Sequence, residues 1–346
     1  RFKMKEIIES IKKGYVGDTE KDTKYLLEQM DKYKDNPKVL NEIYKLLFEL
    51  LPDDLQHTFV RNINQEKFEI RLKEIQELVV NKEYKRALEY LDMSIQHIEP
   101  VYEDEKNVYK SFHSPLDAYL YANMREDKSK FVTNSKLDFG VFHKFRGIIL
   151  KNLGKLEEAE AEFVESFKWN NLDREAIIEY ADVLFQLKKY DEFLKFNLDQ
   201  VKIAYDLYFI AQIYHNIGLY YTTMGTKEAD IDAFNIISYS ITFAETDYAF
   251  RDLNTICEKY HLKKEIAPEE EVKKTFEKEK LPVAPDMDLI KFLIDTARKF
   301  IGVNDEFALN TFKIIYAITH DDITKQFIEA GEKVVQEKRI QKMNKK

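Results

Sequence analysis

The chain has 346 residues, of which 44% are hydrophobic and 34% charged, and its formal net charge is −9. A broad nucleic-acid surface would need clustered Lys and Arg to neutralise phosphates, so nucleic acid is not an expected partner. The single Cys257 excludes an internal disulfide framework and a multi-cysteine metal site. No apolar run is long enough to span a bilayer. We therefore expect a soluble, cytoplasmic protein without a metal or a cofactor.

Residues 1–66 are predicted to form an N-terminal helical segment of about four short helices. Asn36-Pro37 combines a good N-cap with a proline at the first helical position. The charges of this segment are mixed, and it lacks the basic recognition helix expected of a DNA-binding helix-turn-helix. The chain begins at Arg1 rather than Met, which leaves open whether a further segment precedes Arg1.

Residues 67–100 form a first candidate helical hairpin, in which Ala87 marks a close crossing of two helices. Residues 101–139 interrupt the pattern and contain one expected helix, capped at Ser114-Pro115. An insertion of this length usually lengthens a helix pair or covers one face of a repeat array. A specific function could therefore reside in this insertion.

Residues 141–200 contain two helical hairpins at a fixed offset. Leu150 is followed 34 residues later by Leu184, and Leu153 by Leu187. A repeat of this period predicts a solenoid of stacked helix pairs. A third, less regular hairpin follows around Gly218.

Residues 263–285 are rich in both charges and contain three prolines, which predicts a solvated linker or an exposed helix. Residues 286–346 are expected to form a C-terminal helical segment. Its tail from Lys333 is basic, and because cations suit a helix C-terminus, we interpret it as a frayed helix end rather than a nucleic-acid or membrane site.

The hairpins resemble tetratricopeptide repeats (TPR), a family whose helices cross at small residues. The best unit contains Gly147, Leu150, Gly154, Leu156, Ala159 and Phe163, and the next contains Ala181, Leu184, Tyr190 and Phe193. The units are degenerate, since Ile75 stands where the first unit should have a small residue. The resemblance implies an all-α, TPR-like solenoid of stacked antiparallel hairpins over residues 67–262, with extra helices at both ends.

In TPR proteins the first helices of successive hairpins line the concave face. The resemblance therefore selects a candidate ligand-binding set: Lys144, Lys151, Asn152, Asp182, Phe185, Gln212, His215 and Asn216. Mixed polar and aromatic residues on such a wall suit an extended peptide or a partner helix. Asn216 has an alternative interpretation as an interhelix hydrogen bond.

The carboxylate clamp, a familiar TPR site for a chain terminus, is not expected here. Lys144 occupies a clamp-like position, but Ile148 stands in place of the paired Asn. Glu179 and Asp182 would repel a carboxylate.

The expected function is thus a protein- or peptide-binding scaffold. An alternative is a bacterial peptide-sensing regulator that acts through its N-terminal helices. An enzyme is the least favoured hypothesis, because no convergent acid, base or nucleophile can be nominated and the seven His lack a metal-ligand spacing. Oligomeric state does not follow from the residues.

Overall fold

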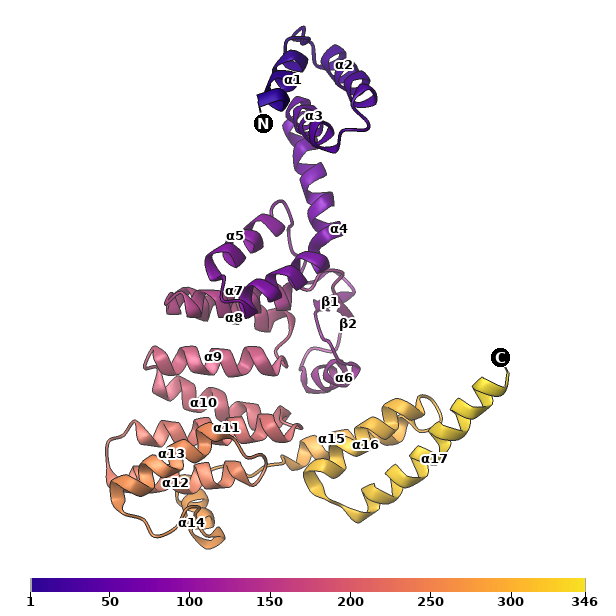
Figure 1. Ribbon diagram of the computed structural model, residues 1–346. Helices are drawn as coiled ribbons and strands as arrows, with labels where there is room; N and C mark the ends of the chain where they lie inside the picture. Colours follow the sequence, from indigo (N-terminus) through magenta and orange to yellow (C-terminus); the bar gives the residue numbers. More distant parts are fainter. Residues whose placement is uncertain (1, 346) are drawn as a thin grey trace. The chain divides into compact units, whose positions relative to one another are not determined.

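The computed structural model describes residues 2–345, and it divides the chain into two compact units (Figure 1). The first unit ends at Val101 and the second begins at Tyr102. The unit boundary therefore lies at the start of the insertion expected from the sequence.

The first unit begins with a helical bundle that has its own core. Its helices are α1 (Phe2–Lys12), α2 (Thr19–Lys32) and α3 (Pro37–Leu50), followed by α4 (Asp53–Val80) and α5 (Tyr84–Ser94). Ile11, Leu26 and Ile43 are buried at the centre of α1–α3. The Asn36 side chain accepts a hydrogen bond from the Val39 amide, which confirms the predicted cap of α3.

Helix α4 is continuous over 28 residues, so a boundary at residue 66 falls inside it. Neither Gly nor Pro occurs between Pro52 and Asn81, and nothing in that stretch ends a helix. The C-terminal half of α4 packs against α5, where Ala87 is fully buried. This pair is the first hairpin predicted from the sequence.

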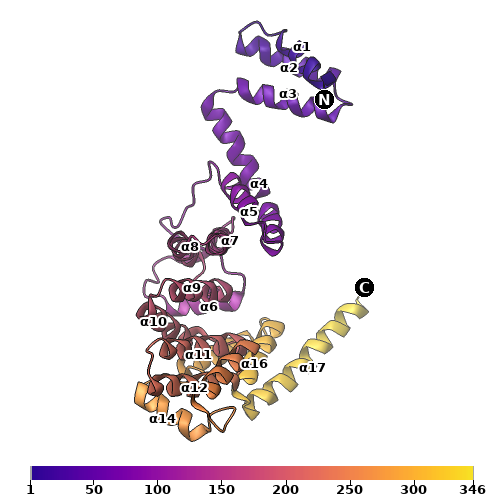
Figure 2. The same ribbon diagram turned by 60° about the vertical axis from the view of Figure 1, so that its left-hand side comes forward.

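The second unit is built around stacked antiparallel helices, which Figure 2 shows as successive layers. They are α7 (Phe139–Asn152), α8 (Leu156–Trp169), α9 (Arg174–Gln186), α10 (Tyr190–Gln200), α11 (Leu207–Thr222), α12 (Lys227–Ile241) and α13 (Asp247–Tyr260), with a 3₁₀ turn η1 (Val201–Ile203) after α10. Each helix packs on its neighbour in sequence. The fold is therefore an all-α, solenoid-like stack, as predicted.

Small residues set how closely the paired helices approach. A Cβ atom on Gly147 would lie 2.8 Å from the Phe163 ring, and one on Gly218 would lie 2.5 Å from Ile237 Cγ1. Ala159 and Ala233, on the facing helices, are fully buried. The small residues that suggested the repeat thus stand where the helices cross.

The turns inside the hairpins require a left-handed backbone. Gly154 has φ +76°, and Lys188, 34 residues later, has φ +59°. A lysine pays a steric cost in this region that glycine avoids. Position 188 therefore has a backbone conformation that favours glycine, but it is occupied by lysine.

Lys188→Gly is expected to raise the free energy of unfolding by about 0.5–1 kcal/mol, because relief of the backbone strain exceeds the entropy that glycine adds to the unfolded chain. The reciprocal change, Gly154→Lys, is the matched control and should destabilise by about 1 kcal/mol. Urea unfolding followed by the fluorescence of Trp169, the single tryptophan, measures both changes. Changes of the same sign and size in the free energy of unfolding of the two variants would contradict the proposed backbone strain at Lys188.

The insertion contains two short strands that the sequence did not reveal. Strands β1 (Asn107–Lys110) and β2 (Phe131–Asn134) pair in parallel, and α6 (Pro115–Met124) connects them. Ser114 caps α6 as predicted. Parallel strands need a crossover connection, which α6 supplies. Four-residue strands are too short to show a clear periodicity, which is why only the helix was expected.

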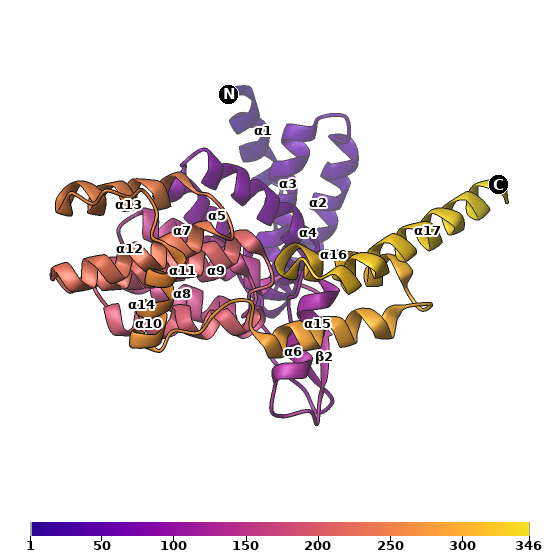
Figure 3. The ribbon, with the colours of Figure 1, turned by 90° about the horizontal axis from the view of Figure 1, so that it is seen from below.

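Residues 263–346 share the core of the second unit instead of forming a linker and a separate segment. Helix α14 (Glu269–Glu279) lies within the expected linker and buries Thr275 and Phe276 against α12. Helices α15 (Met287–Phe300), α16 (Asp305–Thr319) and α17 (Asp322–Asn344) follow, to one side of the stack (Figures 1 and 3). Leu289 and Leu293 of α15 belong to the same apolar core as α11 and α12.

Candidate functional site

One pocket of the second unit collects most of the residues predicted from the sequence. We call it the inner pocket; its volume is about 270 Å³. Its lining is Lys151, Ile178, Glu179, Asp182, Phe185, Phe193, Gln212, His215, Asn216, Leu219 and Tyr248. These residues come chiefly from α7, α9, α11 and α13, the first helices of successive layers. Six of the eight candidate residues therefore meet in one place.

A lysine held by two carboxylates forms one wall of the inner pocket. Lys151 Nζ lies 2.5 Å from Glu179 Oε2 and 2.9 Å from Asp182 Oδ2. Burial by itself would lower the pKa of Lys151, but its hydrogen bonds to Asp182 and Glu179 outweigh burial and raise that pKa. Gln186 Nε2 also donates to Asp182 Oδ2 over 2.8 Å. Lys151 is thus a charged and positioned cross-link between α7 and α9.

An imidazole and two amides of α11 also line the inner pocket. His215 is buried, and its Nε2 lies 2.7 Å from Asp252 Oδ2, whereas its Nδ1 has no hydrogen-bond partner within residues 2–345. Gln212 Oε1 accepts a hydrogen bond from the Tyr248 hydroxyl. Burial raises the pKa of Tyr248 to about 12, so the phenol stays a donor at neutral pH.

Asn216 lines the inner pocket. It also makes an interhelix hydrogen bond, which was the alternative role predicted for it from the sequence. Its Nδ2 donates to Asn197 Oδ1 on α10 over 3.0 Å. Asn197 Nδ2 in turn donates to the Phe193 carbonyl. The amide is therefore held in place between α10 and α11, which orients it without removing it from the pocket wall.

Aromatic side chains also contribute to the lining of the inner pocket. The rings of Phe185 and Phe193 lie 5.1 Å apart, centroid to centroid, and the ring of Tyr190 packs 5.2 Å from Phe185. Phe193 and Tyr248 were not among the candidate residues. Phe193 lies on α10, the second helix of its hairpin, where the repeat pattern has an aromatic residue. Tyr248 lies on α13, and it would have been found if the candidate set had included this further first helix.

Lys144 and Asn152 lie outside the lining of the inner pocket. Lys144 is buried, with its Nζ 3.0 Å from both Asp173 Oδ2 and Glu175 Oε2. Burial would lower the pKa of Lys144, but the charges of Asp173 and Glu175 prevail and raise it. Asn152 is exposed and donates to the Ile148 carbonyl of its own helix.

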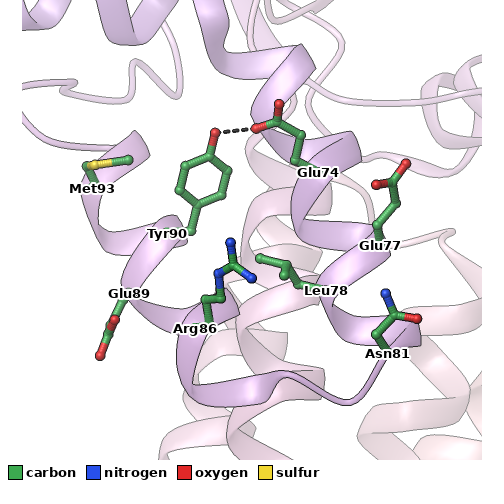
Figure 4. Close-up of a pocket in the computed structure, with 8 residues that line it drawn as sticks. All are labelled: Glu74, Glu77, Leu78, Asn81, Arg86, Glu89, Tyr90 and Met93. Atoms are coloured by element: carbon green, nitrogen blue, oxygen red, sulfur yellow. Dashed lines mark hydrogen bonds between the residues drawn. The ribbon is translucent and has the colours of Figure 1, made fainter. Parts of the chain in front are cut away.

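A second, larger groove occurs in the first unit, between α4 and α5 (Figure 4). Its volume is about 590 Å³. Tyr90 reaches across the groove and donates a hydrogen bond to Glu74, while Arg86 pairs with Glu83 in its own turn and is largely exposed. The groove is an open hairpin surface and includes none of the predicted site residues.

Across residues 2–345, no three His, Cys, Asp or Glu side chains are grouped so that they could hold a metal ion. Within the same residues, none of the helices has the length and apolar character that crossing a bilayer requires.

Comparison with known proteins adds little to this geometry. No family model matches the chain, and no curated protein matches it. Among solved structures, the chain is similar to one from a functional characterization of Pseudomonas aeruginosa PilF, with a TM-score of 0.40 and 10% identity, over 77% of this chain and 98% of that one. Likeness at this level carries no argument, so the site rests on the contacts described above.

Proposed function

We propose that the protein is a scaffold that binds a peptide or a segment of a partner protein in the inner pocket. The observation that carries the proposal is the meeting of six residues, selected through the resemblance to tetratricopeptide repeats, around one cavity. A cavity of about 270 Å³ accepts a single side chain of a ligand. Its lining combines apolar residues with fixed polar groups, which is the usual composition of a binding site.

The walls are arranged before any ligand enters. Lys151, Gln212 and Asn216 each hold a partner on another helix, so their side chains lose little conformational entropy on binding. His215 Nδ1 is the exception. Because Nε2 faces the Asp252 carboxylate, a neutral ring carries its proton on Nε2 and leaves Nδ1 as an acceptor. A peptide N–H would satisfy it.

The test is to select peptides from a random display library and to measure their affinity for the purified protein. Leu219→Trp should fill the inner pocket and weaken the selected peptides about tenfold or more, a change of about 1.4 kcal/mol in binding free energy. Val164→Trp, at an exposed position of the second helix α8, is the matched control and should leave affinity unchanged. Failure to select any peptide, or equal affinity for both variants, would overturn the proposal.

A second proposal is that the chain is a peptide-sensing regulator whose N-terminal helices form the effector. The separate core of α1–α3, with Leu26 and Ile43 fully buried, favours it because such a bundle is a folded element in its own right. A bound peptide should then change the scattering radius of the full chain. An unchanged radius at saturating peptide would exclude this mode of action.

That the protein binds a ligand and does not catalyse a reaction stays a prediction. Turnover of any substrate in a panel of enzyme assays would contradict it.

A further inference from the structure

We propose that the ligand of the inner pocket is a basic, extended peptide whose two cationic side chains are three residues apart. This inference rests on the proposed function and specifies the chemistry of the ligand. It starts from two charge clusters on the first helices. In each, one lysine of α7 is held by two carboxylates: Lys144 by Asp173 and Glu175, and Lys151 by Glu179 and Asp182.

The cations of these clusters are covered, whereas an anion of each faces solvent. The side chains of Lys144 and Lys151 are only 9% and 16% exposed. Those of Glu175 and Asp182 are 61% and 47% exposed. Each cluster carries one more negative charge than positive charge. A ligand that approaches α9 therefore meets carboxylates with an unbalanced charge, and a cationic group is the complementary one.

The spacing of the two exposed carboxylates limits the shape of the ligand. Glu175 and Asp182 are seven residues apart on α9, which places them two turns, or about 10.5 Å, apart along one side of the helix. An extended peptide in the polyproline II conformation has three residues per turn and rises about 3.1 Å per residue, so its residues i and i+3 lie on the same side, about 9 Å apart. Lysine or arginine at positions i and i+3 of such a peptide reaches both carboxylates.

An extended ligand also fits the rest of the inner pocket. Its backbone N–H groups are not consumed by internal hydrogen bonds, as they are in a helix. One of them can donate to His215 Nδ1, which is buried in the pocket wall and has no partner among the described residues. An apolar side chain beside the second cation can enter the cavity that Phe185 and Phe193 help to line.

The experiment is a fluorescence-anisotropy titration of the full chain with labelled nine-residue peptides at moderate and high salt. The peptides share a neutral sequence with one leucine and differ in two lysines placed 2, 3, 4 or 7 residues apart. Matched versions carry glutamine or glutamate instead of lysine. The three-residue spacing should bind tightest, about tenfold tighter than its glutamine version, and the advantage should shrink at high salt.

Two conservative variants connect the preference to the clusters. Glu175→Gln and Asp182→Asn each leave the lysine of the cluster with one carboxylate, so the fold should be preserved. Each variant should reduce the ratio by which the lysine peptide binds more tightly than its glutamine version, and the double variant should abolish this difference. Asp199→Asn is the matched control, because Asp199 is comparably exposed but lies on the second helix α10.

The outcomes separate this inference from the proposed function. Peptides that are excluded by Leu219→Trp but bind without regard to charge would overturn the inference and leave the function standing. Tightest binding at the seven-residue spacing would identify a helical ligand and overturn the extended one. If neither these peptides nor any peptide from the library binds, both proposals fail.

Discussion

Replacing Gly218 by valine should lower the free energy of unfolding of the second unit by about 3 kcal/mol. A Cβ atom there would lie 2.5 Å from Ile237 Cγ1 and 3.3 Å from the Ala233 carbonyl oxygen, so α11 and α12 must separate. The surrounding side chains cannot give way easily, because Ile237 is itself fully buried. Overpacked cores typically lose 1–3 kcal/mol, and this site combines a side-chain clash with a tight backbone contact.

Urea unfolding monitored by Trp169 fluorescence measures this loss. Trp169 is fully buried in the second unit and is the single tryptophan of the chain, so its signal reports that unit alone. Gly154→Ala is the matched control: it also adds a Cβ atom, which meets nothing within 4 Å, although its φ of +76° costs about 1 kcal/mol. If both variants unfold at the same urea concentration, close helix crossing does not explain the repeat glycines.

Replacing Arg174 by methionine should destabilise the second unit by about 3 kcal/mol. Arg174 donates from both terminal nitrogens to the Asp117 carboxylate, each over 3.3 Å, and Asp117 is buried. Its guanidinium also stacks over the Tyr205 ring at 4.3 Å. Without Arg174, the Tyr205 hydroxyl, 2.5 Å from Oδ1, is the one side-chain partner that residues 2–345 leave to the buried Asp117 carboxylate. Burial raises the pKa of Tyr205, so the hydroxyl remains a neutral donor.

The same change should loosen the insertion, because Asp117 joins α6 to α9 and to the segment before α11. Limited proteolysis within residues 125–130 should therefore become faster in Arg174→Met, while mass spectrometry locates the cleavage. The double variant Asp117→Asn with Arg174→Met removes the buried charge and should recover part of the stability. A double variant as unstable as Arg174→Met would show that the cost lies in lost packing and not in the unpaired carboxylate.

Much of the helical layout follows from local sequence. The spacing of Leu150 and Leu184 predicted two equivalent hairpins, and Gly147 and Ala159 marked where their helices cross. Asn36 and Ser114 cap the helices predicted for them. These features depend on residues a few positions apart, and their signal is therefore present in the chain itself.

Other features depend on contacts between distant segments. Thr275 and Phe276 are the buried residues of α14, within a stretch that is otherwise highly charged. Helix α14 belongs to the core only because these two side chains are buried against α12. Strands β1 and β2 exist because α6 brings them side by side. Neither element is long or periodic enough to be recognised before its partner is known.

The candidate site shows the same division. The resemblance to tetratricopeptide repeats selected Asp182, Gln212 and His215 as inward-facing, and the structure places them around one cavity. It could not show that Lys144 and Lys151 are each held by two carboxylates, since those pairs join helices about 30 residues apart. The sequence by itself thus determined which helix faces meet, because helical periodicity is local. Only the tertiary structure decided which charges are covered and which remain for a ligand, because pairing and burial depend on neighbouring helices.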